Sequence, residues 1–186
     1  MLNTQEYGLT RFLLTTLLRT EYYILMEHYT FHLMTQQEAE EVAYEWHYRG
    51  VYSFYNLEND IEALELFLEP RHRKNNYYTV SYQGQTIGLF CFEKEKNGVI
   101  ELGLGIEPSL TGKGLGCQFV EAGIHFCIQN YHPKQITLSV ATFNKRAIKT
   151  YTKVGFEPIY TYKDTMNNQQ IDFLLMKYNI SKRKAI

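Results

Sequence analysis

The sequence has 186 residues, a formal net charge of −1 and 45% hydrophobic residues. A chain of this length and composition is expected to fold as one domain with its own core, so intrinsic disorder is excluded as the default state. A net charge near zero also argues against a nucleic-acid-binding surface, which usually carries a basic excess.

Residues 1–25 are predicted to be an extension in front of the main domain. Their apolar centre, residues 12–18, is much shorter than the ~20 residues needed to cross a bilayer, and no signal-peptide pattern accompanies it. Two interpretations stay open: an additional amphipathic helix, or natural translation that begins at Met26. We expect a cytoplasmic protein without a membrane association, with a domain over 26–180 and a basic tail over 181–186.

The cysteines Cys91, Cys117 and Cys127 show no CxxC spacing, and the six histidines are scattered. This pattern predicts small buried side chains in a reducing compartment, without disulfides and without a metal site. The basic run at residues 71–74 is interpreted as an exposed loop, as such runs usually are.

The first elements after the extension are a strand at 31–34 and a helix that runs to about Tyr48. Thr35 and Glu38 have the spacing of a capping box, which predicts the start of this helix. An aromatic loop over residues 46–55 follows.

A second helix is predicted after Asn59 and Glu62, which repeat the capping spacing, and Pro70 is expected to end it. Two strands come next, at residues 77–82 and 86–92.

The second half of the chain alternates strands and helices. Asn97-Gly98 predicts a hairpin turn into a strand over 99–106. After a glycine-rich loop and its helix come a strand at 135–141, a helix from Asn144, and a closing hairpin of strands 156–162 and 171–178.

The glycine-rich loop, Thr111-Gly-Lys-Gly-Leu-Gly116, is the most informative stretch. Glycines expose backbone N–H groups, and the following helix brings unpaired N–H groups and the positive end of its dipole, so an anion site, most often for phosphate, is predicted. A Walker loop is excluded because Gly114 follows Lys113 and Glu107 stands where that loop has glycine. A dinucleotide fingerprint is weak, since the glycine spacing is G-x-G-x-G and no acidic residue follows at the expected distance.

The loop resembles motif A of the GNAT acetyltransferases, [Q/R]-x-x-G-x-[G/A], and the run from Asn144 to Phe156 resembles a later block of the same family. One position departs from the pattern, because Thr111 stands where the family has Gln or Arg. The resemblance covers roughly residues 29–178. It implies the GNAT α/β fold: a mixed, mostly antiparallel sheet with helices on both faces, splayed at the strands that flank the motif A helix.

The same resemblance implies an N-acetyltransferase that moves an acetyl group from acetyl-CoA to a primary amine on a small molecule or peptide, by direct attack in a ternary complex, and a homodimer is a further expectation. It assigns the diphosphate of the acyl donor to Thr111, Gly112, Lys113, Gly114, Leu115 and Gly116. Backbone N–H groups around Leu104, Gly105 and Ile106 would polarise the thioester carbonyl. A non-catalytic module that holds acyl-CoA stays open, and so does a protein-interaction domain built on the aromatic loop.

Individual site residues each keep a structural alternative. Glu101 shares one face of its strand with Gly103 and Gly105, an arrangement that leaves room for a ligand beside an acid. The resemblance implies that Glu101 is the general base, and the alternative is an exposed strand residue. Tyr151 is a candidate acid toward the departing sulfur or a packed aromatic residue. The remaining candidates are Asn144, as a cofactor contact or helix cap, and Tyr52 and Tyr55, as an acceptor wall or ordinary packing.

Overall fold

The computed structural model describes residues 28–166 and 169–180, which contain a seven-stranded sheet in the order β1-β2-β3-β4-β5-β7-β6. The strands are β1 (Tyr29–Leu33), β2 (Tyr77–Tyr82), β3 (Gln85–Lys94), β4 (Val99–Ile106), β5 (Gln135–Ala141), β6 (Phe156–Met166) and β7 (Gln169–Tyr178). All neighbours are antiparallel except β4 and β5, which run parallel. The expected mixed, mostly antiparallel sheet is confirmed.

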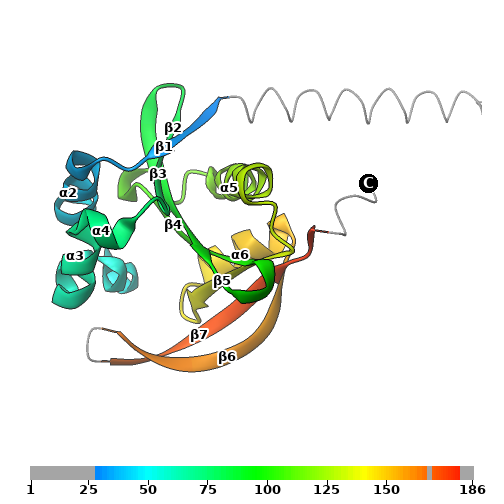
Figure 1. Cartoon of the computed structure of the whole chain (residues 1–186). Coiled ribbons are helices and arrows are strands. Elements are labelled where there is room, and N and C mark those ends of the chain that lie inside the picture. Colours follow the sequence, from blue (N-terminus) through cyan, green and yellow to red (C-terminus); the bar gives the residue numbers. More distant parts are fainter. Residues whose placement is uncertain (1–27, 167–168, 181–186) are drawn as a thin grey trace, which may run out of the picture.

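Helices cover both faces of this sheet (Figure 1). On one side lie α2 (Gln36–Glu45), α3 (Ile61–Leu68) and α4 (Pro70–Arg73), and on the other lie α5 (Gly116–Tyr131) and α6 (Lys145–Val154). Short 3-10 turns occur at η1 (Gly50–Tyr55), η2 (Leu57–Asn59), η3 (Lys96–Gly98) and η4 (Pro108–Leu110). None of the helices in the described ranges is both long and apolar enough to span a bilayer.

The predicted extension over 1–25, the turn at 167–168 and the basic tail over 181–186 lie outside the described residues.

The capping box at the start of α2 is confirmed. The Thr35 hydroxyl accepts a hydrogen bond from the Glu38 N–H at 3.2 Å, and the Glu38 carboxylate accepts one from the Thr35 N–H at 2.8 Å. The predicted cap of α3 is wrong by one residue. Asp60, not Asn59, accepts from the Ala63 N–H at 3.0 Å, because aspartate is an equally good cap and its neighbour already belongs to η2.

Helix α3 ends at Leu68, just before Pro70, as predicted, and Pro70 then opens the short helix α4. Proline is tolerated at a first helical position because its missing N–H would have no helical partner there. The interpretation of residues 71–74 as an exposed loop is wrong for Arg73, which is only 4% exposed. Its guanidinium donates to the carbonyls of Phe67 and Leu68 and to the Gln36 side chain, which ties α3 and α4 to α2.

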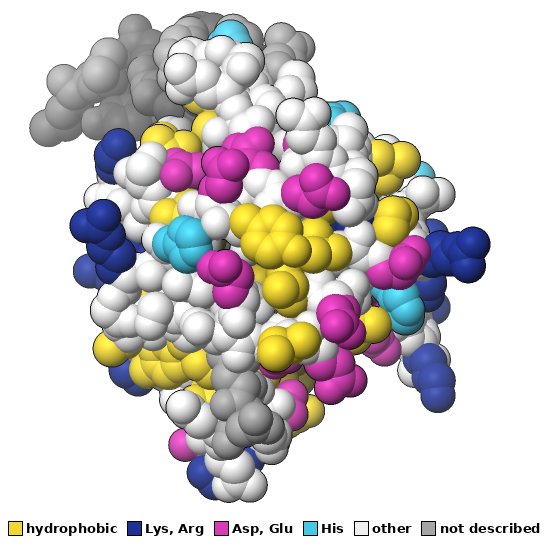
Figure 2. Space-filling model, turned by 90° about the vertical axis from the view of Figure 1, so that its left-hand side faces the viewer, with side chains coloured by type: hydrophobic (Ala, Val, Ile, Leu, Met, Phe, Trp, Pro, Cys, Tyr) yellow, Lys and Arg dark blue, Asp and Glu magenta, His cyan; other side chains and the backbone are white. Residues whose placement is uncertain are grey.

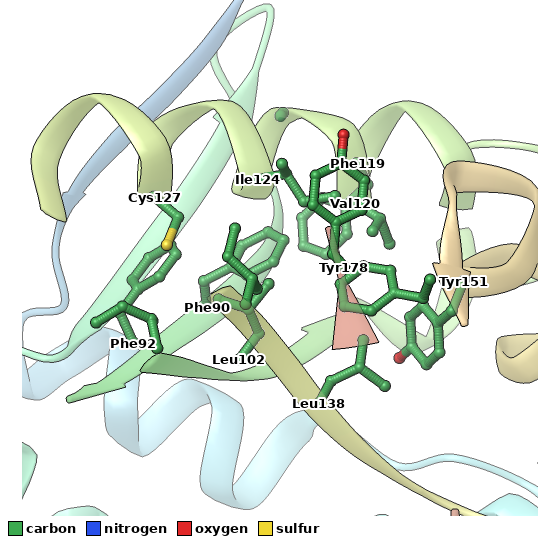
Figure 3. Packing of buried hydrophobic residues seen from close by; sticks show 14 of the residues in the cluster. Phe90, Phe92, Leu102, Phe119, Val120, Ile124, Cys127, Leu138, Tyr151 and Tyr178 are labelled. Carbon is green, nitrogen blue, oxygen red and sulfur yellow. The ribbon is translucent and has the colours of Figure 1, made fainter. Parts of the chain in front are cut away.

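The main core lies between α5 and strands β3 and β4 (Figure 3). Phe90 of β3 stacks on Phe119 of α5 with ring centroids 4.6 Å apart, and Gly123 makes room for the Phe90 ring. Cys91 and Cys127 are buried free thiols, as predicted, while Cys117 is a half-buried free thiol. The packing of Phe90 against Phe119 and Gly123 fixes α5, and therefore the glycine loop at its start, against the sheet.

Replacement of Gly123 tests how tightly α5 packs. A glycine-to-alanine change inside a helix normally stabilises it by about 1 kcal/mol, but a Cβ here would lie 2.2 Å from Cζ of the fully buried Phe90. We expect Gly123→Ala to lower the free energy of unfolding by about 1–3 kcal/mol, measured from urea midpoints. The exposed change Gln118→Ala on the same helix should stay within about 0.5 kcal/mol. A stabilised Gly123→Ala variant would contradict this packing.

Candidate active site

The sheet opens between β4 and β5. Their parallel pairing covers only Val99 to Glu101 opposite Gln135 to Thr137, although both strands continue beyond it. From there β5 stays paired with β7, while β4 stays paired with β3. The predicted splay is confirmed, and it leaves one edge of β4 without a neighbouring strand.

The backbone direction of β4 decides which groups face this opening. The Glu107 N–H donates to the Ile87 carbonyl at 2.9 Å, on the β3 side, and the direction alternates along a strand. Leu104 and Ile106 therefore direct their N–H and C=O groups into the splay, whereas Gly105 directs its own toward β3. Three residues were predicted to offer a backbone N–H to a thioester in this opening. The Gly105 N–H does not face the opening, because it points toward β3.

Tyr48, from the aromatic loop, reaches across to this edge. Its hydroxyl donates to the Ile106 carbonyl at 2.9 Å, and it would lie 3.3 Å from a Cβ on Gly105. Burial raises the pKa of Tyr48 well above its ordinary value, so the hydroxyl stays a donor. The space beside Gly105, which the sequence suggested for a ligand, is thus partly filled by the protein itself.

The glycine loop has the conformation of an anion cradle. Gly112 and Gly114 have φ of 80° and 88°, and a Cβ on Gly114 would meet no atom within 4 Å. Six backbone N–H groups between residues 112 and 118 donate to no acceptor in the described part of the protein. They are those of Gly112, Gly114, Leu115, Gly116, Cys117 and Gln118. These donors at the start of α5 fit a diphosphate.

Other loop positions differ from the expectation. Both donors of Thr111 are used internally, since its N–H and its hydroxyl each bond to the Pro108 carbonyl, at 3.2 and 2.9 Å. The Lys113 N–H points to the Leu110 carbonyl at 3.4 Å, and its side chain is exposed. Gly116 serves packing as well, because a Cβ there would lie 3.2 Å from Thr150 of α6.

Helix α6 brings Asn144 and Tyr151 to the same region. Asn144 is the N-cap: its carbonyl oxygen accepts from the Ala147 N–H at 3.1 Å, and its amide donates to the Tyr55 hydroxyl at 3.2 Å. Tyr151 is 9% exposed, and burial, with smaller effects of Tyr55 and Tyr48, raises the pKa of Tyr151 well above its usual range. Tyr48 and Tyr55 lie edge-on with ring centroids 6.5 Å apart, and both are close enough to Tyr151 to influence its pKa.

The two tyrosines predicted as an acceptor wall both have other contacts. The Arg146 guanidinium lies over the Tyr52 ring, with its Cζ atom 4.5 Å from the ring centroid. A cationic amine on that face of the ring would therefore be repelled by a like charge. Tyr55 holds Asn144 and packs edge-on against Phe54. These contacts argue against an acceptor wall made by Tyr52 and Tyr55.

Glu101 lies at the point where the splay begins. Its carboxylate accepts a hydrogen bond from the Ser139 hydroxyl of β5 at 2.9 Å, and the residue is half-buried rather than fully exposed. Directly across the β3–β4 ladder stands a second carboxylate, Glu93. Sequence reasoning missed this pairing, because it depends on the register of two strands joined by a turn.

A pocket of about 420 Å³ lies between the aromatic loop, η4 and the start of α6. It is lined by His47, Tyr48, Arg49, Tyr52, Pro108, Ser109, Thr111 and Arg146. Two arginines make this pocket electropositive, beside the loop whose N–H groups are free. Arg146 was also missed from the sequence, although it stands two residues after Asn144.

Comparisons with known proteins agree with this geometry. The sequence profile of the family described as an acetyltransferase (GNAT) domain matches residues 27–157. A spermine/spermidine N(1)-acetyltransferase of Bacillus subtilis is 31% identical in an alignment of 107 residues, with 52% of this chain and 70% of that protein covered.

Two solved structures share the fold. The spermidine N-acetyltransferase of Vibrio cholerae, in complex with CoA and spermine, superposes with a TM-score of 0.68 at 20% identity, over 84% of this chain and 98% of that one. AAC(6')-Ib, in complex with ribostamycin and coenzyme A, gives a TM-score of 0.65 at 22% identity, over 84% and 96%. The chain therefore belongs to the GNAT acetyltransferase family, and it is an acetyl-CoA-dependent N-acetyltransferase rather than a non-catalytic module.

Proposed function

We propose that this enzyme acetylates a small polycationic amine of the polyamine class, by direct attack of the amine on acetyl-CoA in a ternary complex. The observation that carries the proposal is the pair of carboxylates Glu93 and Glu101. They stand directly opposite each other on neighbouring antiparallel strands, where like charges are normally destabilising. Within the described residues, neither forms an ion pair with a lysine, arginine or histidine.

An uncompensated pair of this kind is suited to a ligand with more than one positive charge. Glu101 keeps part of its carboxylate free beyond the Ser139 bond, and Glu93 is exposed. An acceptor with two ammonium groups can pair with both, whereas a monoamine can pair with only one. The carboxylate pair thus favours a polycation over a simple amine.

The charge of residues 35–69, which we call the helical cover and which contain α2 and α3, supports the same class of acceptor. Residues 35–69 contain nine acidic residues and one arginine, a net charge of −8, against −1 for the whole chain. Figure 2 shows this face, on which acidic side chains surround apolar ones. A field of one sign attracts an oppositely charged ligand and raises its association rate. The acceptors in the names of the Bacillus subtilis relative and the Vibrio cholerae structure are polyamines.

The proposed chemistry assigns one task to each group. An alkylamine with a pKa near 10 is only about one part in a thousand neutral at pH 7, a handicap of roughly 4 kcal/mol. Glu101 accepts the amine proton, directly or through water. The nitrogen then bonds to the thioester carbon, the C–S bond breaks, and the sulfur leaves with the electron pair and takes up the second proton, which the nitrogen loses as the amide forms.

Two further groups stabilise the charge that develops. The N–H groups of Leu104 and Ile106, which face the splay, are placed to donate to the carbonyl oxygen as it becomes negative. The Tyr151 hydroxyl donates a hydrogen bond to the departing sulfur. Because burial raises its pKa, the Tyr151 hydroxyl stays protonated at neutral pH and remains a hydrogen-bond donor.

A homodimer, expected from the resemblance, stays a prediction, and an assembly of copies is part of our proposal. Large apolar side chains are exposed on the helical cover, including Ile61 at 71% and Val51 at 65%. The Vibrio cholerae enzyme has been described as dodecameric. Light scattering on the full chain tests this, and a monomer at micromolar concentration would count against it.

Tyr151→Phe tests the proposed role of the tyrosine hydroxyl. Loss of a hydrogen bond to a charged sulfur should lower kcat about 10- to 100-fold, with the affinity for CoA changed less than about threefold. The rising limb of the pH profile should be unaltered, since it reports the loss of the amine proton. Tyr178→Phe is the matched control, because Tyr178 is also a buried tyrosine that packs on Phe156. Equal effects of the two changes would show that Tyr151 has only a packing role.

Glu93→Gln tests the acceptor class. Removing one exposed carboxylate should raise KM for a triamine or tetramine about three- to tenfold, while KM for a monoamine changes less than twofold. Glu95→Gln is the control, since this glutamate is also exposed and lies just beyond the end of β3. The enzyme is also incubated with a panel of acceptors, and mass spectrometry identifies the acetylated products. The panel contains polyamines, aminoglycosides, monoamines and peptide N-termini. Acetylation confined to monoamines or peptides would refute the proposal.

A further inference from the structure

The family pattern places a long donor side chain at the first position of the glycine loop, and this chain has Thr111 instead. The hydroxyl of Thr111 has one proton, which it donates to the Pro108 carbonyl at 2.9 Å, and its N–H points to the same oxygen. Thr111 therefore offers no donor to a ligand on the loop. A diphosphate bound there would lack the side-chain contact that the usual glutamine or arginine provides.

Arg146 lies across the loop from the first turn of α6. One guanidinium nitrogen, Nη1, is 4.0 Å from the position that a Cβ on Gly112 would occupy. Arg146 also lines the electropositive pocket together with Thr111 and Ser109. A cationic side chain from a different helix thus reaches the place where the loop lacks its own donor.

The donors of this guanidinium are available. Among the described residues, Arg146 forms no ion pair, and its side chain makes no hydrogen bond to protein. The nearby Glu107 carboxylate is already bound by the Ser109 N–H and hydroxyl. Five N–H donors in a planar fork match phosphate oxygens better than a point charge does.

Tyr52 holds the guanidinium in this position. The Arg146 Cζ atom lies 4.5 Å from the centroid of the Tyr52 ring, a cation–π arrangement that holds the guanidinium against the ring. This contact fixes a side chain that would otherwise sample many rotamers, so less entropy is lost when phosphate binds. The aromatic loop thereby serves the acyl donor rather than the amine.

We propose that Arg146, held by Tyr52, is the diphosphate-binding donor of this enzyme and replaces the side chain missing at Thr111. The inference concerns acetyl-CoA binding alone, so it stands or falls independently of the proposed acceptor class. It makes Arg146 a ligand-contacting residue and Tyr52 a positioning residue.

The test measures binding in the absence of any amine, by calorimetry with three ligands: CoA, dephospho-CoA and pantetheine. Arg146→Ala should weaken CoA and dephospho-CoA by the same factor, about 10- to 100-fold, and leave pantetheine, which has no diphosphate, unchanged. Arg146→Lys should recover only part of the loss, because a lysine keeps the charge but not the fork. Lys153→Ala, which removes an exposed cation from the other end of α6, should change none of the three.

Tyr52 provides the second arm. Tyr52→Leu should weaken CoA about three- to fivefold through loss of the stacking contact, while Tyr52→Phe, which keeps the ring, should stay within twofold. Arg146→Ala that behaves like Lys153→Ala would overturn the proposal. So would a loss seen with CoA but not with dephospho-CoA, since Arg146 would then contact the 3′-phosphate. Both Arg146 and Lys153 are exposed, so these variants should fold normally, which circular dichroism checks.

Discussion

The early end of the β4–β5 ladder is the constraint on which the site depends. If pairing continued beyond Glu101, the N–H and C=O groups of Leu104 and Ile106 would bond to β5, and no backbone edge would remain for a ligand. Instead β5 continues with β7 as far as Ala141, and β4 continues with β3. The opening is stable because each strand keeps one complete ladder, so only a short edge loses its partner.

The glycines around this opening do different work. Gly112 and Gly114 have positive φ, and the space beside Gly114 is open, which suits a bound anion. Gly105, Gly116 and Gly123 instead allow protein groups to approach: the Tyr48 hydroxyl, the Thr150 side chain and the Phe90 ring. The last two contacts fix α5 against its neighbours, so the direction of its free N–H groups is set by the core rather than by the loop.

Local sequence signals predicted most of the fold and part of the site. The capping box at Thr35 and the Asn144 cap each depend on residues three positions apart, so they could be found from the sequence. The glycines themselves located the anion-binding loop, and the family resemblance located the splay. Adjacent caps of equal quality, Asn59 and Asp60, could not be ranked locally, and the burial of Arg73 depends on carbonyls and a side chain from two other helices.

The missed site residues share one property: each acquires its role from a distant segment. Glu93 matters because the β3–β4 register sets it opposite Glu101, and composition gives no hint of that register. Arg146 matters because the aromatic loop folds back so that Tyr52 lies beneath it. The same fold-back gives Tyr52 and Tyr55 their contacts with Arg146 and Asn144, which the sequence could not indicate because it does not show which surface each ring covers.

Three tyrosines of the aromatic loop contact three different segments on the proposed coenzyme side of the site. Tyr48 bonds to the β4 backbone, Tyr52 stacks on Arg146, and Tyr55 accepts a hydrogen bond from Asn144. A change in this loop therefore disturbs several contacts to the coenzyme half at once. The acidic outer surfaces of α2 and α3 take part in none of these three contacts. Under the proposed roles, substitutions on those helices would change which amine is accepted without altering these three contacts.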